Sequence, residues 1–137
     1  MNIEIELNKT LLGMTAVVAL VGDRVWDEWF RTSVVPAIVF EIDTENREND
    51  ISGRGGLVFA DVNIICRADT RAASRELAEA VRMNGSTSPG SGLAGYSGAF
   101  DAVLDDTQPA AVPKGEGSNA YWYDTNMSFT MSWPEAV

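Results

Sequence analysis

Two short clusters carry residue types that hold cofactors or metals in other proteins. The run Gly90-Ser91-Gly92-Leu93-Ala94-Gly95 has the spacing G-x-G-x-x-G. In a dinucleotide site this motif follows a strand and opens a helix whose N-terminus holds the pyrophosphate. Here it follows Pro89 in a Ser/Gly-rich stretch, and no helical pattern comes after it. We therefore interpret the glycines as loop composition and predict no cofactor.

The second cluster is Asp101, Asp105 and Asp106, whose carboxylates are the kind of ligand that hard divalent cations prefer. On the strand predicted here, Asp101 and Asp105 share one face while Asp106 points away. The spacing favours a solvated strand end, so no metal site is predicted. The chain also has no histidine, no cysteine pair and no nucleophile beside a recognisable base. We expect no enzymatic activity.

Aromatic and charged residues supply candidates of a different kind. Three large aromatics fall within five residues and cannot all reach a core from a short loop, so core packing and an interface are both open for them. A mixed charge run and a later Gly-containing loop are either solvated surface or docking segments. The candidate interface residues are Trp26, Trp29, Phe30, Arg47, Glu48, Asp50, Arg54, Lys114 and Glu116.

Composition limits the classes of protein. A length of 137 residues with 45% hydrophobic residues suits one domain, and we expect residues 1–137 to form it. No apolar run approaches the length of a bilayer span, and the N-terminus lacks a signal-peptide pattern, so we expect a globular protein that works where it is made. The net charge of −10 disfavours direct binding to nucleic acid. The single Cys66 is expected to be a packed thiol.

The elements that would position these residues begin with a helical stripe from Ile3 to Val21, through Leu7, Leu11, Met14 and Val18, which Gly13 either bends or leaves continuous. A short strand entry follows at 24–26 and a strand at 38–43. The strongest pattern is a strand with Val58 to Cys66 on its buried face, leading directly into a helix over 69–82 with Asp69 as its N-cap.

Later segments alternate between loops and strands. We predict loops over 45–56, 84–98 and 109–119, the second too poor in apolar residues to pack. A strand is expected near 100–104, and the run 123–133 alternates so regularly that it should be central or paired along its length. The predicted fold class is α+β: a two-layer, mainly antiparallel sheet of four to five strands with two helices packed on one face.

In this order the chain resembles the tail terminator proteins of long-tailed phages, also called tail completion or tail-to-head joining proteins. The resemblance rests on the run Ala19 to Val25, the strand opening at Pro36 to Phe40, the strand–helix unit Leu57 to Arg82, the glycine-rich loop and the two final strands. It covers nearly the whole chain, but this chain has Gly13-Met14-Thr15 where the family usually has a capping acid.

The resemblance implies a virion protein of the tail or neck, assembled in the host cytoplasm. It would form a hexameric ring on the tail tube, end polymerisation and join tail to head. Its partners would be further copies of itself, the tail tube protein and a head-tail connector or stopper, with DNA passing through the lumen unbound and no membrane involved. The alternatives are another neck component, a gene-transfer-particle equivalent, or a small-ligand-binding domain that uses 84–98 as a lid.

Overall fold

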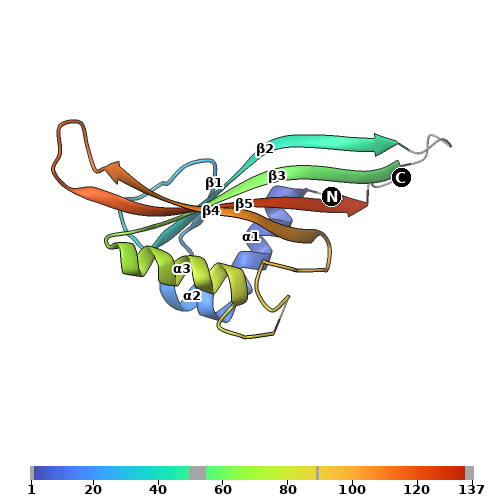
Figure 1. Cartoon of the computed structure of the whole chain (residues 1–137), viewed down its shortest axis with the longest axis horizontal. Helices are drawn as coiled ribbons and strands as arrows, with labels where there is room; N and C mark the ends of the chain where they lie inside the picture. The colour runs from blue at the N-terminus through green and yellow to red at the C-terminus, as the bar shows by residue number, and fades with distance from the viewer. Residues whose placement is uncertain (1, 50–54, 89, 135–137) are drawn as a thin grey trace.

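The computed structural model describes residues 2–49, 55–88 and 90–134. Within these ranges a five-stranded sheet forms one layer and three helices form the other (Figure 1). The elements are α1 (Ile3–Leu12), α2 (Thr15–Val21), β1 (Val25–Asp27), β2 (Ala37–Asn49), β3 (Gly55–Ala68), α3 (Arg71–Met83), β4 (Asp101–Pro113) and β5 (Tyr121–Pro134). The predicted α+β class with a mainly antiparallel sheet is confirmed.

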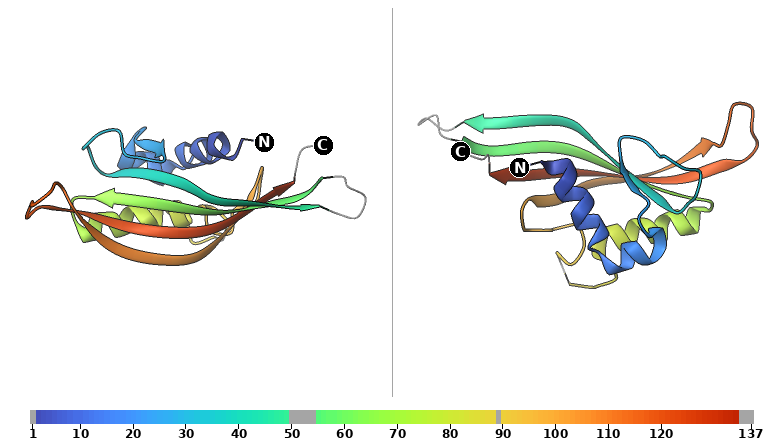
Figure 2. Two further views of the ribbon diagram at one scale, coloured as in Figure 1. Left: turned by 90° about the horizontal axis from the view of Figure 1, so that it is seen from above. Right: turned by 180° about the vertical axis from the view of Figure 1, so that it is seen from behind.

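The strands lie in the order β1-β2-β3-β5-β4, and the sheet is mixed because β1 pairs with β2 in parallel while the other pairs are antiparallel. β5 pairs along its length with both β3 and β4, so that Phe129 lies opposite Val62 on one side and Leu104 on the other. This confirms the prediction for the final strand. The β2–β3 and β4–β5 hairpins extend toward opposite ends of the molecule (Figure 2).

The N-terminal stripe forms two helices because the chain leaves helical geometry at Met14, whose φ and ψ are −86° and 113°. The N–H of Gly13 caps α1 by donating to the carbonyls of Lys9 and Thr10. The break changes the helical phase, so Val17 is buried while Val18 is 38% exposed. The predicted assignment of Val18 to the buried stripe is therefore wrong.

The unit formed by β3 and α3 has the predicted buried faces. Every second residue of β3 from Val58 to Cys66 is buried, as are Leu77 and Val81 on α3. The N-cap, however, is Thr70 and not Asp69, because the Thr70 hydroxyl accepts the N–H of Ala73 at 3.1 Å. Cys66 is fully buried, as expected, and burial raises the pKa of its thiol.

Two of the predicted loops are partly strand. The segment 45–56 is predicted as a long hairpin loop, but β2 continues to Asn49 and β3 begins at Gly55, so residues 45–49 and 55–56 are strand. β4 continues to Pro113, which leaves only residues 114–120 of the region around the predicted loop 109–119 as a turn. β4 is an edge strand, a position in which a proline such as Pro109 is tolerated. Because these exposed strand segments are rich in polar residues, their sequences resemble those of loops.

The glycine-rich segment 84–98 packs against the end of α3 instead of lying free. Leu93 is fully buried, and its N–H donates to the Val81 carbonyl at 2.8 Å. A Cβ on Gly92 would lie 2.3 Å from the carbonyl oxygen of Arg82, so only glycine permits this approach. The prediction of an unpacked loop is wrong, because one leucine and one close backbone contact are enough to hold it. As predicted, no helix follows the G-x-G-x-x-G run in the described residues up to 134.

Candidate interaction surface

The three neighbouring aromatics have two different placements. Trp26 lies on β1 opposite Val39, and its ring meets that of Phe30 edge to face, with centroids 6.5 Å apart and an interplanar angle of 80°. Both rings are half-buried. Trp29 instead projects outward with 61% of its surface exposed, and the Arg31 guanidinium carbon lies 5.6 Å from its ring centroid. The contact between Trp26 and Phe30 therefore anchors the loop 28–36, and the same loop exposes Trp29 to solvent.

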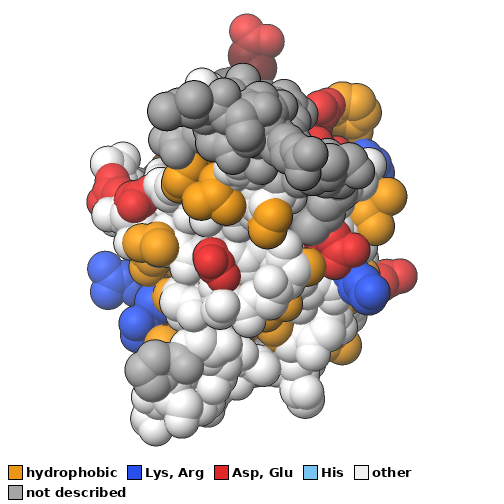
Figure 3. All heavy atoms as spheres, turned by 90° about the vertical axis from the view of Figure 1, so that its right-hand side faces the viewer, with side chains coloured by type: hydrophobic (Ala, Val, Ile, Leu, Met, Phe, Trp, Pro, Cys, Tyr) orange, Lys and Arg blue, Asp and Glu red, His pale blue; other side chains and the backbone are white. Residues whose placement is uncertain are grey.

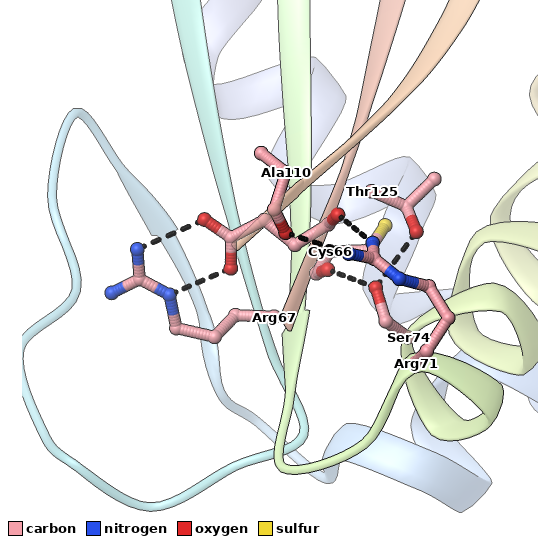
Figure 4. A network of polar contacts seen from close by, with 7 residues as sticks. Cys66, Arg67, Arg71, Ser74, Ala110 and Thr125 are labelled. Atoms are coloured by element: carbon pink, nitrogen blue, oxygen red, sulfur yellow. Dashed lines mark hydrogen bonds and ion pairs between the residues drawn. The ribbon is translucent and has the colours of Figure 1, made fainter. Parts of the chain in front are cut away.

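Phe30 packs against an ion pair on the sheet face opposite the helices. The Arg67 guanidinium carbon lies 4.2 Å from the Phe30 centroid and 5.8 Å from that of Trp122. Arg67 also donates from Nε and Nη2 to the two carboxylate oxygens of Asp124, at 2.8 and 3.0 Å (Figure 4). The exposed fractions of the two side chains are 18% for Arg67 and 5% for Asp124. This bidentate geometry satisfies a nearly buried carboxylate.

On the other side of the same strands, polar contacts join α3 to the sheet. Arg71 donates to the backbone carbonyls of Asp124 on β5 and Ala110 on β4, at 3.0 and 3.3 Å (Figure 4). The Ser74 hydroxyl donates to the Cys66 carbonyl at 2.9 Å, so its 2.7 Å contact with Thr125 uses the threonine as donor. The first turns of α3 thus hold the β4–β5 hairpin against β3.

Lys114, in the turn between β4 and β5, joins the same assembly of side chains. Its Nζ lies 4.3 Å from the Trp122 ring centroid and 2.9 Å from a carboxylate oxygen of Asp69. Tertiary folding therefore places Lys114 and Phe30, 84 positions apart in the numbering, on either side of Arg67 and Trp122. We call Phe30, Arg67, Trp122 and Lys114 the cation–aromatic cluster.

The remaining candidates are less fully described. Glu116 is exposed in the β4–β5 turn. Arg47 and Glu48 belong to β2, but their side chains lie outside the described part of the molecule, as do residues Asp50 and Arg54 altogether. The structure thus brings Trp26, Phe30 and Lys114 into one region, with Trp29 beside them.

Sequence reasoning missed the residues that connect this region, namely Arg67, Trp122 and Asp124. One signal was available, because Arg67 occupies an outward position of β3 near its end, where an isolated charge needs a partner. The partner lies 57 positions away and is directly opposite only in the β3–β5 register. No local pattern reveals that pairing.

Acidic residues gather on the sheet face that carries Arg67. Asp43 on β2 accepts from Asn63 on β3, and Asn63 in turn accepts from Ser128 on β5. On β4 the register shift after Leu104 changes the face to which Asp106 belongs. Asp101 and Asp106 both lie opposite serines of β5, so they share a face, whereas Asp106 was predicted to point away. The exposed acids of this face are Asp43, Asp61, Asp101 and Asp106, with Asp105 at the irregularity bonded to Thr130.

A recess of about 340 Å³ near β1 is also acidic. Burial, Glu28 and Glu4 raise the pKa of the Asp27 carboxyl, with the burial effect largest. Within residues 2–49, 55–88 and 90–134, no cluster of three or more potential ligand side chains has an arrangement that could hold a metal ion. The recess is lined by Glu4, Asp27, Glu28, Glu41, Ile42 and Asp43.

Hydrophobic and charged side chains are interspersed on the end of the molecule seen in Figure 3. Among the described residues, no helix is both long and apolar enough to cross a bilayer. The exposed large hydrophobic side chains lie on several elements, and Trp29 is the largest of them. Among the described residues, these side chains therefore supply separate contact points.

Comparison with known proteins places the chain in a family. No curated protein matches the chain. A family model described as tail completion protein gp17 matches residues 6–91, which is more than half of the 137 residues. The match runs from α1 to the glycine-rich segment after α3 and includes Trp29 and Arg67. The family is structural and non-enzymatic, and this chain belongs to it as a component of the phage tail or neck.

Proposed function

We propose that copies of this chain close into a hexameric ring on the end of a completed tail tube, stop tube polymerisation and join the tail to the head. The observation that carries the proposal is the match to the tail completion family over residues 6–91. Capping a polymer end requires occupation of that end and no reaction. A protein that acts in this way needs contact surfaces, and the described residues supply several.

Ring closure needs two different, mutually complementary surfaces on each copy, since a heterologous contact repeats with rotation. The molecule has two chemically different faces. One carries the aromatic loop 28–36 and the exposed acids of the sheet, and the other is covered by the helices (Figure 2). This difference supports a head-to-tail arrangement of subunits.

The charge suits a ring through which DNA passes without binding. Six copies with a net charge of −10 each carry roughly −60 in total. The exposed acids Asp43, Asp61, Asp101 and Asp106 form a surface that would repel the phosphates of a duplex. We propose that these acids contribute to a negative electrostatic potential in the lumen.

We further propose that residues 1–137 act as one domain and that its projecting segments meet the tube protein and the head-tail connector or stopper. The segments are the β2–β3 hairpin, whose sequence includes Arg47 and Glu48 and, outside the described residues, Asp50 and Arg54, and the turn with Lys114 and Glu116. The hairpins extend to opposite ends of the molecule, as contacts with two different neighbours along a tail axis require (Figure 1).

Phage particles assembled without this protein provide the test. We expect tails of abnormal length, together with tails that carry no head, in electron micrographs of lysates from a deletion mutant. A plasmid-borne wild-type copy should restore normal particles and is the control. Tails of normal length without heads would assign the protein to joining alone, as a connector or stopper. Normal infectious particles in the deletion lysate would refute both assignments.

A further inference from the structure

A groove of about 750 Å³ lies between α2 and α3 on the helical face of the molecule. Small and apolar side chains form its walls, including Ala16, Ala19 and Leu20 from α2 and Met83 from α3. Its charged residues are Glu76, Glu79 and Arg82, of which the last two bond each other at 2.9 Å. The charges of Glu79 and Arg82 cancel, so Glu76 gives the rim a net negative charge.

The Trp29 loop, residues 28–36, has the complementary chemistry. Of the four tryptophans, Trp29 is the one that the structure leaves mostly exposed. The same loop exposes 54% of Val34 and places the Arg31 guanidinium beside the Trp29 ring. It therefore presents an apolar surface beside the Arg31 cation, which is opposite in charge to Glu76 on the groove's rim; the loop as a whole is neutral because it also contains Glu28.

The loop cannot fill the groove of its own chain. Phe30 attaches the loop to Arg67, which points away from the helices because the preceding residue, Cys66, points into the core beneath them. The groove is lined by residues of α2 and α3, and these helices lie on the other side of the sheet (Figure 2). A contact between loop and groove must therefore join two molecules.

We propose that the Trp29 loop of one copy docks in the α2–α3 groove of the next, with Arg31 facing Glu76. The groove volume exceeds what one indole needs, and buried aromatics beside an arginine are the residue types that dominate interface energies. Since the two surfaces differ, the contact is heterologous and can repeat around a ring. This inference rests on the proposed ring and identifies its subunit contact.

Two variants separate the surfaces. Trp29→Ala removes the docking side chain, and Ala19→Trp fills the groove from an exposed helix position. We expect each variant alone to show at least tenfold weaker self-association than wild type in sedimentation velocity. Mixed together, they should form a 1:1 heterodimer, because Trp29→Ala retains its groove and Ala19→Trp retains its loop. The heterodimer cannot grow further.

Matched controls are Val103→Ala, which truncates another exposed apolar residue, and Ala72→Trp, which adds an indole on α3 outside the groove. Both should associate as wild type does. In addition, Glu76→Arg should restore association to Arg31→Glu when the two changes are combined. Rescue by charge exchange would not occur if the substitutions acted through folding alone.

The outcomes distinguish this contact from the proposed function. If Trp29→Ala and Ala19→Trp each form hexamers as readily as the wild-type chain, the docking is overturned while the ring remains supported. A mixture without heterodimers, or a wild-type chain that stays monomeric up to millimolar concentration, would also overturn it. Heterodimers in the mixture together with normal tails in a deletion lysate would support the docking and refute the capping role.

Discussion

Removing one partner of the Arg67–Asp124 pair should destabilise the subunit far more than loss of a surface salt bridge. Arg67→Met leaves the Asp124 carboxylate, whose side chain is 5% exposed, without its two hydrogen bonds. Breaking a buried pair in this way typically costs about 3–5 kcal/mol, whereas exposed pairs contribute about 0–1 kcal/mol. Because Arg67 itself is 18% exposed, we expect a value near the lower end, about 3 kcal/mol.

The double variant makes the test specific. Replacing both partners, as Arg67→Met with Asp124→Leu, leaves no unpaired charge, so the combined loss should be smaller than that of Arg67→Met alone. Arg67→Lys should be intermediate, since it keeps the charge but cannot reproduce the bidentate contact or the planar stacking on Phe30. Only an unpaired buried carboxylate explains this order of stabilities.

Urea unfolding of the isolated subunit, followed by tryptophan fluorescence at pH 7, gives the free energies of unfolding. The expected loss is a large part of the 5–15 kcal/mol typical of a domain and is easily resolved. If Arg67→Met costs less than about 1 kcal/mol and the double variant is simply additive, the pair behaves as a surface salt bridge and the argument from burial fails.

Three further substitutions test other parts of the structure by the same assay. Phe129→Ala should cost about 3–5 kcal/mol, because it opens a cavity in the core shared with Leu77; near-wild-type stability would contradict that placement. Gly92→Ala should lower the free energy of unfolding, because its Cβ would meet the Arg82 carbonyl at 2.3 Å, while Gly115→Ala, with open space around it, should be harmless. Asp27→Asn should stabilise the subunit at pH 7. A carboxyl whose pKa is raised in the folded state binds its proton more tightly when the protein is folded. The stability of the wild type therefore falls as the pH rises from 3.8, the ordinary pKa of this carboxyl, through the pKa in the folded state. The gain should vanish at acid pH, where Asp27 is protonated in both states, and a gain that persists there would contradict the electrostatic cause.

The predicted elements that proved correct are those in which one pattern repeats over many residues. The alternation from Val58 to Cys66, and the same alternation along β5, place their buried faces because a strand turns every second side chain to the same side. Breaks in periodicity were harder to place. Gly13 left a bent or continuous helix open, and the assignment of Val18 failed because the break shifted the phase.

The misassigned loops share one physical cause. A strand at a sheet edge or beyond the helices has little to bury, so β2 beyond Thr44 and β4 beyond Asp105 are rich in polar residues or proline and resemble loops in sequence. Pairing with a neighbouring strand holds them extended, and that neighbour is distant in sequence. The anchoring of Leu93 against the end of α3 is equally non-local.

The sequence by itself determined the α+β class, the buried faces of β3, α3 and β5, and a resemblance that the family match confirms over residues 6–91. These follow from local periodicity and from the order of elements. Only the tertiary structure decided that Phe30 is held by Arg67 while Trp29 projects. It also decided that Lys114 reaches Trp122 and that a groove lies between α2 and α3. Each of these depends on which strands become neighbours and in what register, a choice made by the whole core and by no single segment.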